Sequence, residues 1–240
     1  MRYALMALSF GLAIAPVLAA APYDKTEKTG AYEIRLRIPA EAMAIAPLKA
    51  ELFARWKKDS DDIKDEAKQE KSEAPQYFHA YALDTNWRIS FESARLISLS
   101  GYSYIDENGA HPNAAFDSIV WDKTANRAVP FEALFARGQE KAAFKAIATA
   151  ARKTWIATVN KGAGGDPVDP SMANEGIGDD AKHLGHYALT YAKGERKVNG
   201  IVLLYGAGEA WAHAMGDFRL AIPVSVFRKY LAPKWAAEFR

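Results

Sequence analysis

Apolar and polar residues alternate without interruption from Tyr32 to Ile38, where every second residue is Tyr, Ile or Leu and those between are Glu or Arg. A period of two places the apolar side chains on one face of an extended chain, so this segment predicts a half-buried β-strand that ends at Pro39. From Ala40 to about Lys71, apolar residues recur three to seven positions apart among many charged ones. That spacing predicts a long amphipathic helix, and the mixed signs of its charges are typical of a solvated helix face.

Two runs of strand-forming residues follow the helix. They are Tyr77–Leu83 and Trp87–Leu99, and we expect a strand in each, with a turn at Asp84-Thr85-Asn86 between them. The second run leads into Gly101–Asp122, whose two β-prone arms flank a polar connection and predict a β-hairpin. An antiparallel meander is therefore expected from about residue 76 to residue 122.

The second half of the chain predicts another long helix and a group of short strands. Gln139–Lys161 carries apolar residues at helical spacing, and three later runs fit strands: Tyr187–Ala192, Ile201–Tyr205 and Phe218–Pro223. Val224–Leu231 fits a terminal helix that stops before a proline. Together the elements predict an α+β fold, in which an antiparallel sheet with a meander packs against two long helices and a short C-terminal helix.

Residues 1–21 predict a secretory signal peptide, because Arg2 precedes an apolar run from Tyr3 to Ile14 that ends in a string of small residues. We expect cleavage after Ala19. The alternative is a retained membrane anchor, but the run is shorter than the roughly 20 residues that a span needs. No later segment is apolar enough to span a membrane. The expected location is therefore periplasmic or secreted.

Composition narrows the possible chemistry. The 240 residues include no cysteine, which excludes disulfides, metal thiolates, thiol nucleophiles and a lipid-modified amino terminus. Lysine and arginine number 31 against 29 acidic residues, a formal charge of +2. Without a clustered basic stripe, no nucleic-acid partner is expected. About 220 residues remain after the signal peptide, and a chain of that length can bury a full core without covalent cross-links.

Residues 162–182 are rich in Gly, Pro and Asp and have almost no apolar content, so they predict a long mobile loop that folding does not need. The loop and the segment after it contain side chains that could bind a hard cation: Asp166, Asp169, Glu175, Asp179, Asp180, His183 and His186. The spacing matches neither an EF-hand nor an HExxH helix. We therefore favour a solvated loop and predict neither a metal nor a cofactor.

No specific catalytic constellation is present, since the chain has no GxSxG elbow, no SxxK and no phosphate-binding glycine loop. Among the five histidines, His111 is the candidate general base, with Asp106, Glu107 or Asp117 as its carboxylate partner. This combination supports one hypothesis for function, a hydrolase of cell-wall or glycan material. It requires His111 to lie in a cleft within hydrogen-bonding reach of a carboxylate.

The hairpin connection is the candidate binding surface. Its Asp106-Glu107-Asn108-Gly109 segment tolerates the positive φ of a tight turn, and the Pro-stiffened corner Gly109–Asn113 follows. A rigid corner mounted on a sheet loses little entropy on binding. The small-residue stretch Gly206–Asp217 is expected beside it. The candidate binding residues are Tyr104, Asp106, Glu107, Asn108, Gly109, His111, Pro112 and Asn113.

Short motifs in the same order resemble two domains of uncharacterised bacterial envelope proteins. The strand ending at Pro39, the charged helix and Trp87–Tyr104 resemble a PdaC-like domain, which assigns residues 22–105 to that part. Gly109–Asn113, Pro130–Phe135 and Gly216–Pro223 resemble an RsiV-like domain, which assigns residues 106–240 to the second part. No linker separates the two parts, so we expect one cooperative unit.

The resemblance implies an extracytoplasmic α+β domain without established chemistry of its own. Members are fused to anti-sigma factors whose outer domain binds lysozyme, or to polysaccharide deacetylases whose catalytic residues lie in another domain. The sequence differs from the common GGAH form at Asn108, and it shows neither a later membrane span nor a deacetylase metal motif. The favoured hypothesis is a non-catalytic binding protein that recognises a lysozyme-type muramidase or the wall polymer, peptidoglycan.

Overall fold

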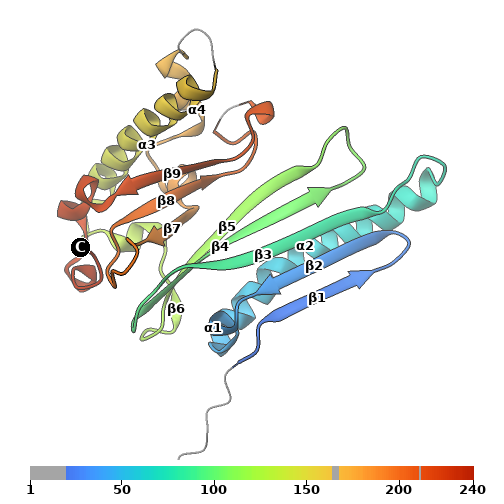
Figure 1. Cartoon of the computed structure of the whole chain (residues 1–240), viewed down its shortest axis with the longest axis horizontal. Helices are drawn as coiled ribbons and strands as arrows, with labels where there is room; N and C mark the ends of the chain where they lie inside the picture. The colour runs from blue at the N-terminus through green and yellow to red at the C-terminus, as the bar shows by residue number, and fades with distance from the viewer. Residues whose placement is uncertain (1–19, 164–167, 211) are drawn as a thin grey trace, which may run out of the picture.

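The computed structural model describes residues 20–163, 168–210 and 212–240, and most of the predicted signal peptide, residues 1–19, lies outside that range. The chain forms two sheets (Figure 1), a six-stranded one in the order β1 to β6 and a three-stranded one in the order β7-β8-β9. The six-stranded sheet comprises β1 (Tyr23–Lys28), β2 (Tyr32–Ile38), β3 (Tyr81–Glu92), β4 (Leu96–Asp106), β5 (Asn113–Asp122) and β6 (Arg127–Ala128). The mixed α+β class is as the sequence predicts.

The first predicted strand and helix are confirmed. Burial alternates along β2 with its apolar residues inside. The predicted helix is present as a short α1 (Ala40–Met43) and a long α2 (Ala46–Glu73), separated at Ile45, which is extended. Pro47 lies in the first turn of α2, where its missing N–H is not needed. Because α2 leads from β2 to a parallel neighbour, β3, this part of the sheet is a βαβ unit and not antiparallel.

The predicted turn at residues 84–86 is wrong, because β3 runs without a break through them and reverses only at Ser93–Arg95. The polar residues that suggested a turn have partners inside the sheet: Asp84 pairs with Arg37, and the Thr85 hydroxyl lies 2.9 Å from that of Ser103. The true turn is closed by the Ser93 hydroxyl, which accepts hydrogen bonds from the backbone N–H groups of Arg95 and Leu96. From β3 to β5 the predicted antiparallel meander is confirmed, and the short strand β6, which was not predicted, extends it.

Strand β1 was not predicted. Its sequence, YDKTEK, is polar on both faces and five of its six residues are exposed, so no alternation marks it. It is an edge strand that pairs with β2 and carries charged side chains, which discourages pairing with another chain.

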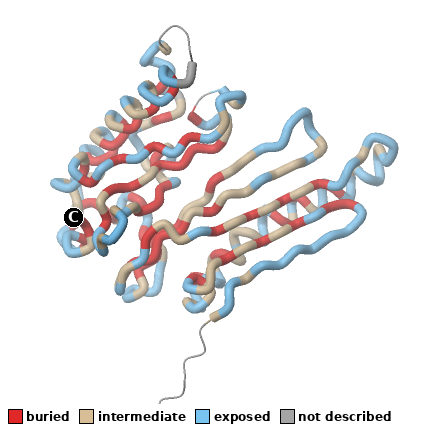
Figure 2. The backbone as a smooth tube through the Cα atoms, in the orientation of Figure 1, coloured by how far each residue is buried: buried red, intermediate tan, exposed pale blue. Residues whose placement is uncertain are grey.

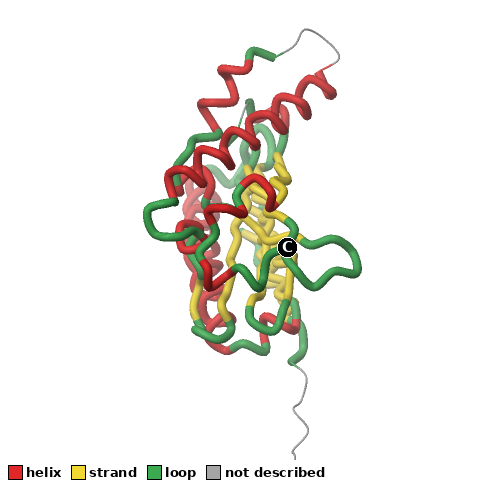
Figure 3. Tube along the Cα trace, turned by 90° about the vertical axis from the view of Figure 1, so that its left-hand side faces the viewer, coloured by secondary structure: helices red, strands yellow, loops and turns green. Residues whose placement is uncertain are grey.

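The remaining predicted strands are confirmed, and together with the second long helix they form a second layer. It comprises α3 (Glu140–Ala163), β7 (Tyr187–Thr190), β8 (Gly200–Tyr205) and β9 (Phe218–Pro223). The C-terminal helical segment consists of separate 3-10 turns at Val224–Val226, Arg228–Tyr230 and Pro233–Trp235. Viewed from the side, the long helices gather on one side of the strands (Figure 3). No helix of the described residues is long and apolar enough to cross a membrane.

The two sheets are joined by a continuous core. Along β4, Ile97 and Leu99 pack with α2, whereas Leu96 and Ser98 face the other way, towards β7 and α3. The buried Ser98 hydroxyl accepts a hydrogen bond from the Leu189 N–H at 2.9 Å, and the Tyr187 hydroxyl donates to the main-chain carbonyl of Val129, directly after β6. Buried segments occur in both sheets (Figure 2), and one apolar cluster combines residues of β3, β4 and β5 with residues of β7 and α3. The three-stranded sheet covers the end of β3, β4 and β5 that lies near residue 96. The end near the β4–β5 hairpin tip extends beyond it (Figure 1).

The expectation that residues 162–182 form a solvated loop is wrong for the part that the structure describes. Two short helical turns occur there, η2 (Pro170–Met172) and α4 (Ala173–Gly176), followed by α5 (Ala181–Leu184). Ala173 and Ile177 are fully buried in the core with α3. Two apolar residues at helical spacing were enough to attach the segment to the core, although its composition is mostly polar.

Asp122 holds the turn after β5. Its side chain is buried and accepts hydrogen bonds from the Thr124 N–H at 2.9 Å, the Ala125 N–H at 3.0 Å and the Arg95 guanidinium at 3.2 Å. Burial favours the neutral acid, but these donors outweigh it and hold the pKa of Asp122 below its usual range. The contribution to stability is therefore complete above the unfolded pKa of about 3.9 and is lost as the pH falls through the lower folded value.

We expect Asp122→Asn to lower the free energy of unfolding by about 1–3 kcal/mol at pH 7, because charge-assisted hydrogen bonds are lost. Urea titrations from pH 7 to pH 3 should show this difference from the wild type shrinking in acid. Asp62→Asn, at an exposed ion pair with Lys58, is the matched control and should change little. A difference that stays constant down to pH 3 would contradict the assigned role.

Candidate functional site

The β4–β5 hairpin carries the predicted binding residues and ends in a tight turn. Asn108 adopts a φ of 65°, the left-handed conformation that the sequence predicts for this connection. Its N–H donates to the Asp106 carboxylate at 3.2 Å, which closes the turn. Tyr104 lies near the end of β4 with 40% of its surface exposed. In Figure 1 the hairpin tip lies between the end of α2 and the loop that joins β8 to β9.

On one side the tip is bound to α2. The Asn108 side-chain amide donates to the Glu70 carboxylate at 3.0 Å, and Glu70 also accepts a hydrogen bond from the Tyr81 hydroxyl. Asp106 lies 3.6 Å from the His79 ring nitrogen. Partial burial, and then the nearby charge of Glu66, raises the pKa of Glu107. This side of the hairpin therefore carries a cluster of carboxylates.

On the other side the tip contacts the loop between β8 and β9. The His111 ring stacks on the His213 ring with centroids 4.2 Å apart, and His213 Nε2 lies 3.0 Å from the side-chain amide oxygen Oδ1 of Asn113. A Cβ at Gly206 would approach the Ala114 carbonyl oxygen to 2.9 Å, so glycine permits the close passage of this loop. The stretch 206–217 thus lies beside the hairpin, with Trp211 outside the described residues.

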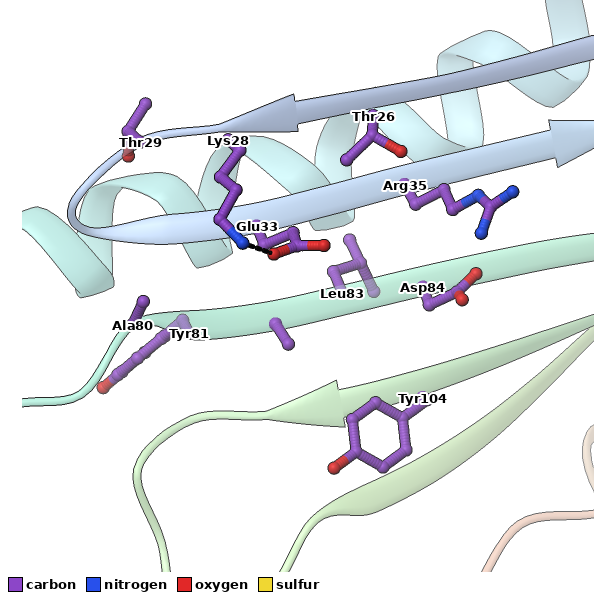
Figure 4. A pocket seen from close by; sticks show the side chains of 11 residues that line it. Thr26, Lys28, Thr29, Glu33, Arg35, Ala80, Tyr81, Leu83, Asp84 and Tyr104 are labelled. Atoms are coloured by element: carbon purple, nitrogen blue, oxygen red, sulfur yellow. Dashed lines mark hydrogen bonds and ion pairs between the residues drawn. The ribbon is translucent and has the colours of Figure 1, made fainter.

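A groove of about 430 Å³ lies next to Tyr104, across β1 to β4 (Figure 4). Charged side chains line part of it: Lys28 is paired with Glu33, and Arg35 is held by two hydrogen bonds to Asp24 at 2.7 and 2.9 Å. The lining residues are Thr26, Lys28, Thr29, Glu33, Arg35, Ala80, Tyr81, Ala82, Leu83, Asp84 and Tyr104. Hydroxyls, paired charges and one exposed aromatic ring give the groove hydrogen-bonding capacity and a stacking surface.

The geometry does not assemble the predicted catalytic pair. His111 is exposed, and within the described chain its ring contacts His213 and the Pro112 carbonyl oxygen rather than a carboxylate. Asp106 is engaged with Asn108, and Asp117 forms an ion pair with Arg55 at 2.8 Å. The requirement set for the hydrolase hypothesis, a cleft that joins His111 to an acid, is not met.

The candidate cation ligands do not converge either. Within the residues that the structure describes, no group of three or more His, Asp and Glu side chains is placed to hold a metal. His183 instead pairs with Asp180 at 2.9 Å, where Asp180 caps α5. Asp166 lies outside the described residues.

Three residues of this surface were not predicted from the sequence. Tyr77 is 78% exposed, and its carbonyl oxygen lies 3.5 Å from the Asn108 amide nitrogen. His79 and His213 reach the tip from opposite sides. Tyr77 begins the run Tyr77–Leu83, whose composition predicts a strand, so the sequence held no signal that its ring is exposed. The two histidines are single polar residues far from the hairpin in sequence, and only the fold brings them there.

Comparison with known proteins identifies the fold. A DUF3298 family protein from Pseudomonas aeruginosa PAO1 superimposes with a TM-score of 0.60 at 13% identity, covering 89% of this chain and 95% of that one. A member of the same family from Bacteroides fragilis NCTC 9343 gives 0.56 at 12% identity, with 91% and 95% covered. The fold is that of DUF3298 family proteins. It is consistent with the resemblance to PdaC-like and RsiV-like domains. No family model and no curated protein sequence matches the chain.

Proposed function

We propose that this chain is a non-catalytic binding protein of the cell envelope, periplasmic or secreted, that recognises a lysozyme-type muramidase through its hairpin tip. The observation that carries the proposal is the two-sided support of the tip, by Glu70 on α2 and by His213 in the β8–β9 loop. A surface fixed in this way loses little conformational freedom when a partner binds. The RsiV-like resemblance supplies the partner class.

The exposed chemistry of the tip suits a protein partner. Tyr77 and Tyr104 offer large amphipathic rings with few rotatable bonds, which are favoured at protein interfaces. Asp106 and Glu107 follow Tyr104 in the hairpin, and the next residue, Asn108, donates a hydrogen bond to Glu70. Lysozymes are commonly cationic, so these carboxylates would speed encounter and make the association rate depend on salt.

Peptidoglycan is the second candidate ligand, favoured by the groove of Figure 4. An exposed Tyr104 ring at the edge of a groove lined by hydroxyls and charged groups is a surface on which a sugar ring can stack and form hydrogen bonds. A sedimentation assay with purified peptidoglycan separates the two candidates, because only the polymer carries the protein into the pellet.

Calorimetric titration of the mature protein with several lysozymes should detect binding. We expect Tyr104→Ala to weaken it at least tenfold, as truncation of a central aromatic contact does, and His111→Ala to weaken it less. Tyr191→Ala is the matched control, since that tyrosine is 49% exposed and contacts Phe91 at the far end of β3. Each variant is first checked for an unchanged thermal transition.

Two outcomes would defeat the lysozyme proposal. One is the absence of heat at tens of micromolar protein with every lysozyme tested. The other is unchanged affinity in both hairpin variants, because the contact surface would then lie elsewhere on the molecule.

A further inference from the structure

A second cleft, of about 260 Å³, lies between the open face of the six-stranded sheet and the strands β8 and β9. Its lining residues are Asn86, Arg88, Ser100, Tyr102, Phe116, Leu204 and Arg219. The sheet register explains the grouping. Arg88 pairs with Ser100, and Asn86 pairs with Tyr102, which in turn pairs with Phe116, so two adjacent rows of one face form the floor.

The wall of the cleft is a single row of the other sheet, because Leu204 of β8 is the register partner of Arg219 of β9. Phe116 and Leu204 are buried and pack in one apolar cluster, which closes the base. The two arginines are exposed and lie at the rim. The cleft therefore has an apolar base, a polar floor and two cations contributed by different sheets.

The two cations lack strong partners. Arg88 forms no ion pair with any other residue that the structure describes, whereas Arg35 and Arg37 on the same sheet each have a carboxylate. Arg219 lies over the Phe116 ring, 4.9 Å from its centroid, and its only carboxylate neighbour in the described chain is Asp217 at 3.4 Å. Among the residues that the structure describes, no acidic side chain lines the cleft.

The arrangement favours an anion. A guanidinium group binds a carboxylate through two parallel N–H donors, and stacking on Phe116 holds the plane of Arg219 while leaving its N–H edge available. An anion bound at the rim between Arg88 and Arg219 would pair with both guanidinium groups and relieve the repulsion between them. The Asn86 amide and the Ser100 hydroxyl add donors and acceptors suited to hydroxyl groups, and the Tyr102 ring adds an apolar contact.

We propose that this cleft binds a single sugar unit that bears a carboxylate. The carboxylate lies between Arg88 and Arg219, the ring hydroxyls bond to Asn86 and Ser100, and the apolar side of the sugar faces Tyr102. The size agrees with one residue of a polymer or one free monosaccharide, since sites for drug-sized ligands begin at about 300 Å³. The proposal does not depend on lysozyme recognition, which uses the hairpin tip.

Calorimetric titration at millimolar ligand tests the proposal with four sugars. N-acetylmuramic acid and glucuronic acid should bind, and N-acetylglucosamine and glucose, which lack the carboxylate, should not. Binding to both acids indicates a general site for acidic sugars, and binding to N-acetylmuramic acid alone indicates a wall component. Arg88→Gln and Arg219→Gln should each weaken binding about tenfold or more. Arg228→Gln, an exposed arginine outside the cleft, is the matched control and should change nothing.

A variant that strengthens binding guards against effects of misfolding. Asp217→Asn removes the neighbour that competes for Arg219, so affinity for the acidic sugars should rise a few-fold. Equal binding of neutral and acidic sugars, no binding of any sugar, or affinity that is unchanged in both arginine variants would overturn the proposal. So would inorganic sulfate that binds as tightly as the acids, because the cleft would then be a simple anion site. Lysozyme binding measured on Arg88→Gln should equal that of the wild type, which keeps the two proposals separable.

Discussion

Replacing Phe91 by alanine is expected to lower the stability of the entire chain by about 3–5 kcal/mol, the usual cost of truncating a buried aromatic residue. Phe91 lies in β3, within residues 22–105 that the sequence motifs assign to a first part, yet it is buried in the core formed by α3 and the three-stranded sheet. At roughly 2–4 °C per kcal/mol for a chain of this size, the melting temperature should fall by about 6–20 °C. Because the core is shared, calorimetry should still show a single transition.

The matched control for this prediction is Tyr191→Ala. Tyr191→Ala removes a ring that lies 5.9 Å from Phe91 but is half exposed, so it should cost much less. Two transitions in the wild type, or a stable proteolytic fragment ending near residue 105, would contradict a single cooperative unit. Splitting of the transition in Phe91→Ala alone would show that coupling between the two parts depends on this one residue.

The elements with strong periodicity could be predicted from the sequence because the fold and the local pattern agree there. Burial along β2 follows the alternation of its residues, and the hairpin turn has the positive φ that Asn108 tolerates. The errors occurred where tertiary partners override composition. Asp84 and Thr85 are typical turn residues, but in β3 one pairs with Arg37 and the other with Ser103. β1 is held only by tertiary partners, namely its neighbour β2 and contacts with α2 such as the Glu27–Lys64 ion pair.

The two candidate sites also differ in how far the sequence could indicate them. The hairpin residues are contiguous, so a sequence pattern could indicate them together. The cleft residues come from five strands between Asn86 and Arg219, and each alone is an ordinary strand residue. Their chemistry arises from register: two rows of one sheet and one row of another face each other. No local spacing in the chain encodes that juxtaposition.

Substituting Ile177 should have the second large effect, in a segment whose composition suggests that it is dispensable. Ile177 is fully buried against α3, and its carbonyl oxygen accepts a hydrogen bond from Arg152 Nε at 2.8 Å. Ile177→Ala should therefore cost about 2–5 kcal/mol, the range for truncating a fully buried isoleucine. That corresponds to a fall in melting temperature of roughly 4–20 °C.

Met172→Ala is the matched control, because this methionine lies in the same segment but is 43% exposed and should change stability by about 0.5 kcal/mol or less. Differential scanning calorimetry of both variants beside the wild type distinguishes an attached segment from a free loop. If the segment is a free loop, neither variant should change stability, because a side chain that is exposed to water in both the folded and the unfolded protein contributes no burial energy. A large loss in Ile177→Ala alone would show that the short turns after α3 are part of the folded core. Replacing the whole segment by a Gly/Ser linker should then destabilise the protein at least as much as Ile177→Ala, because it removes Ala173 as well.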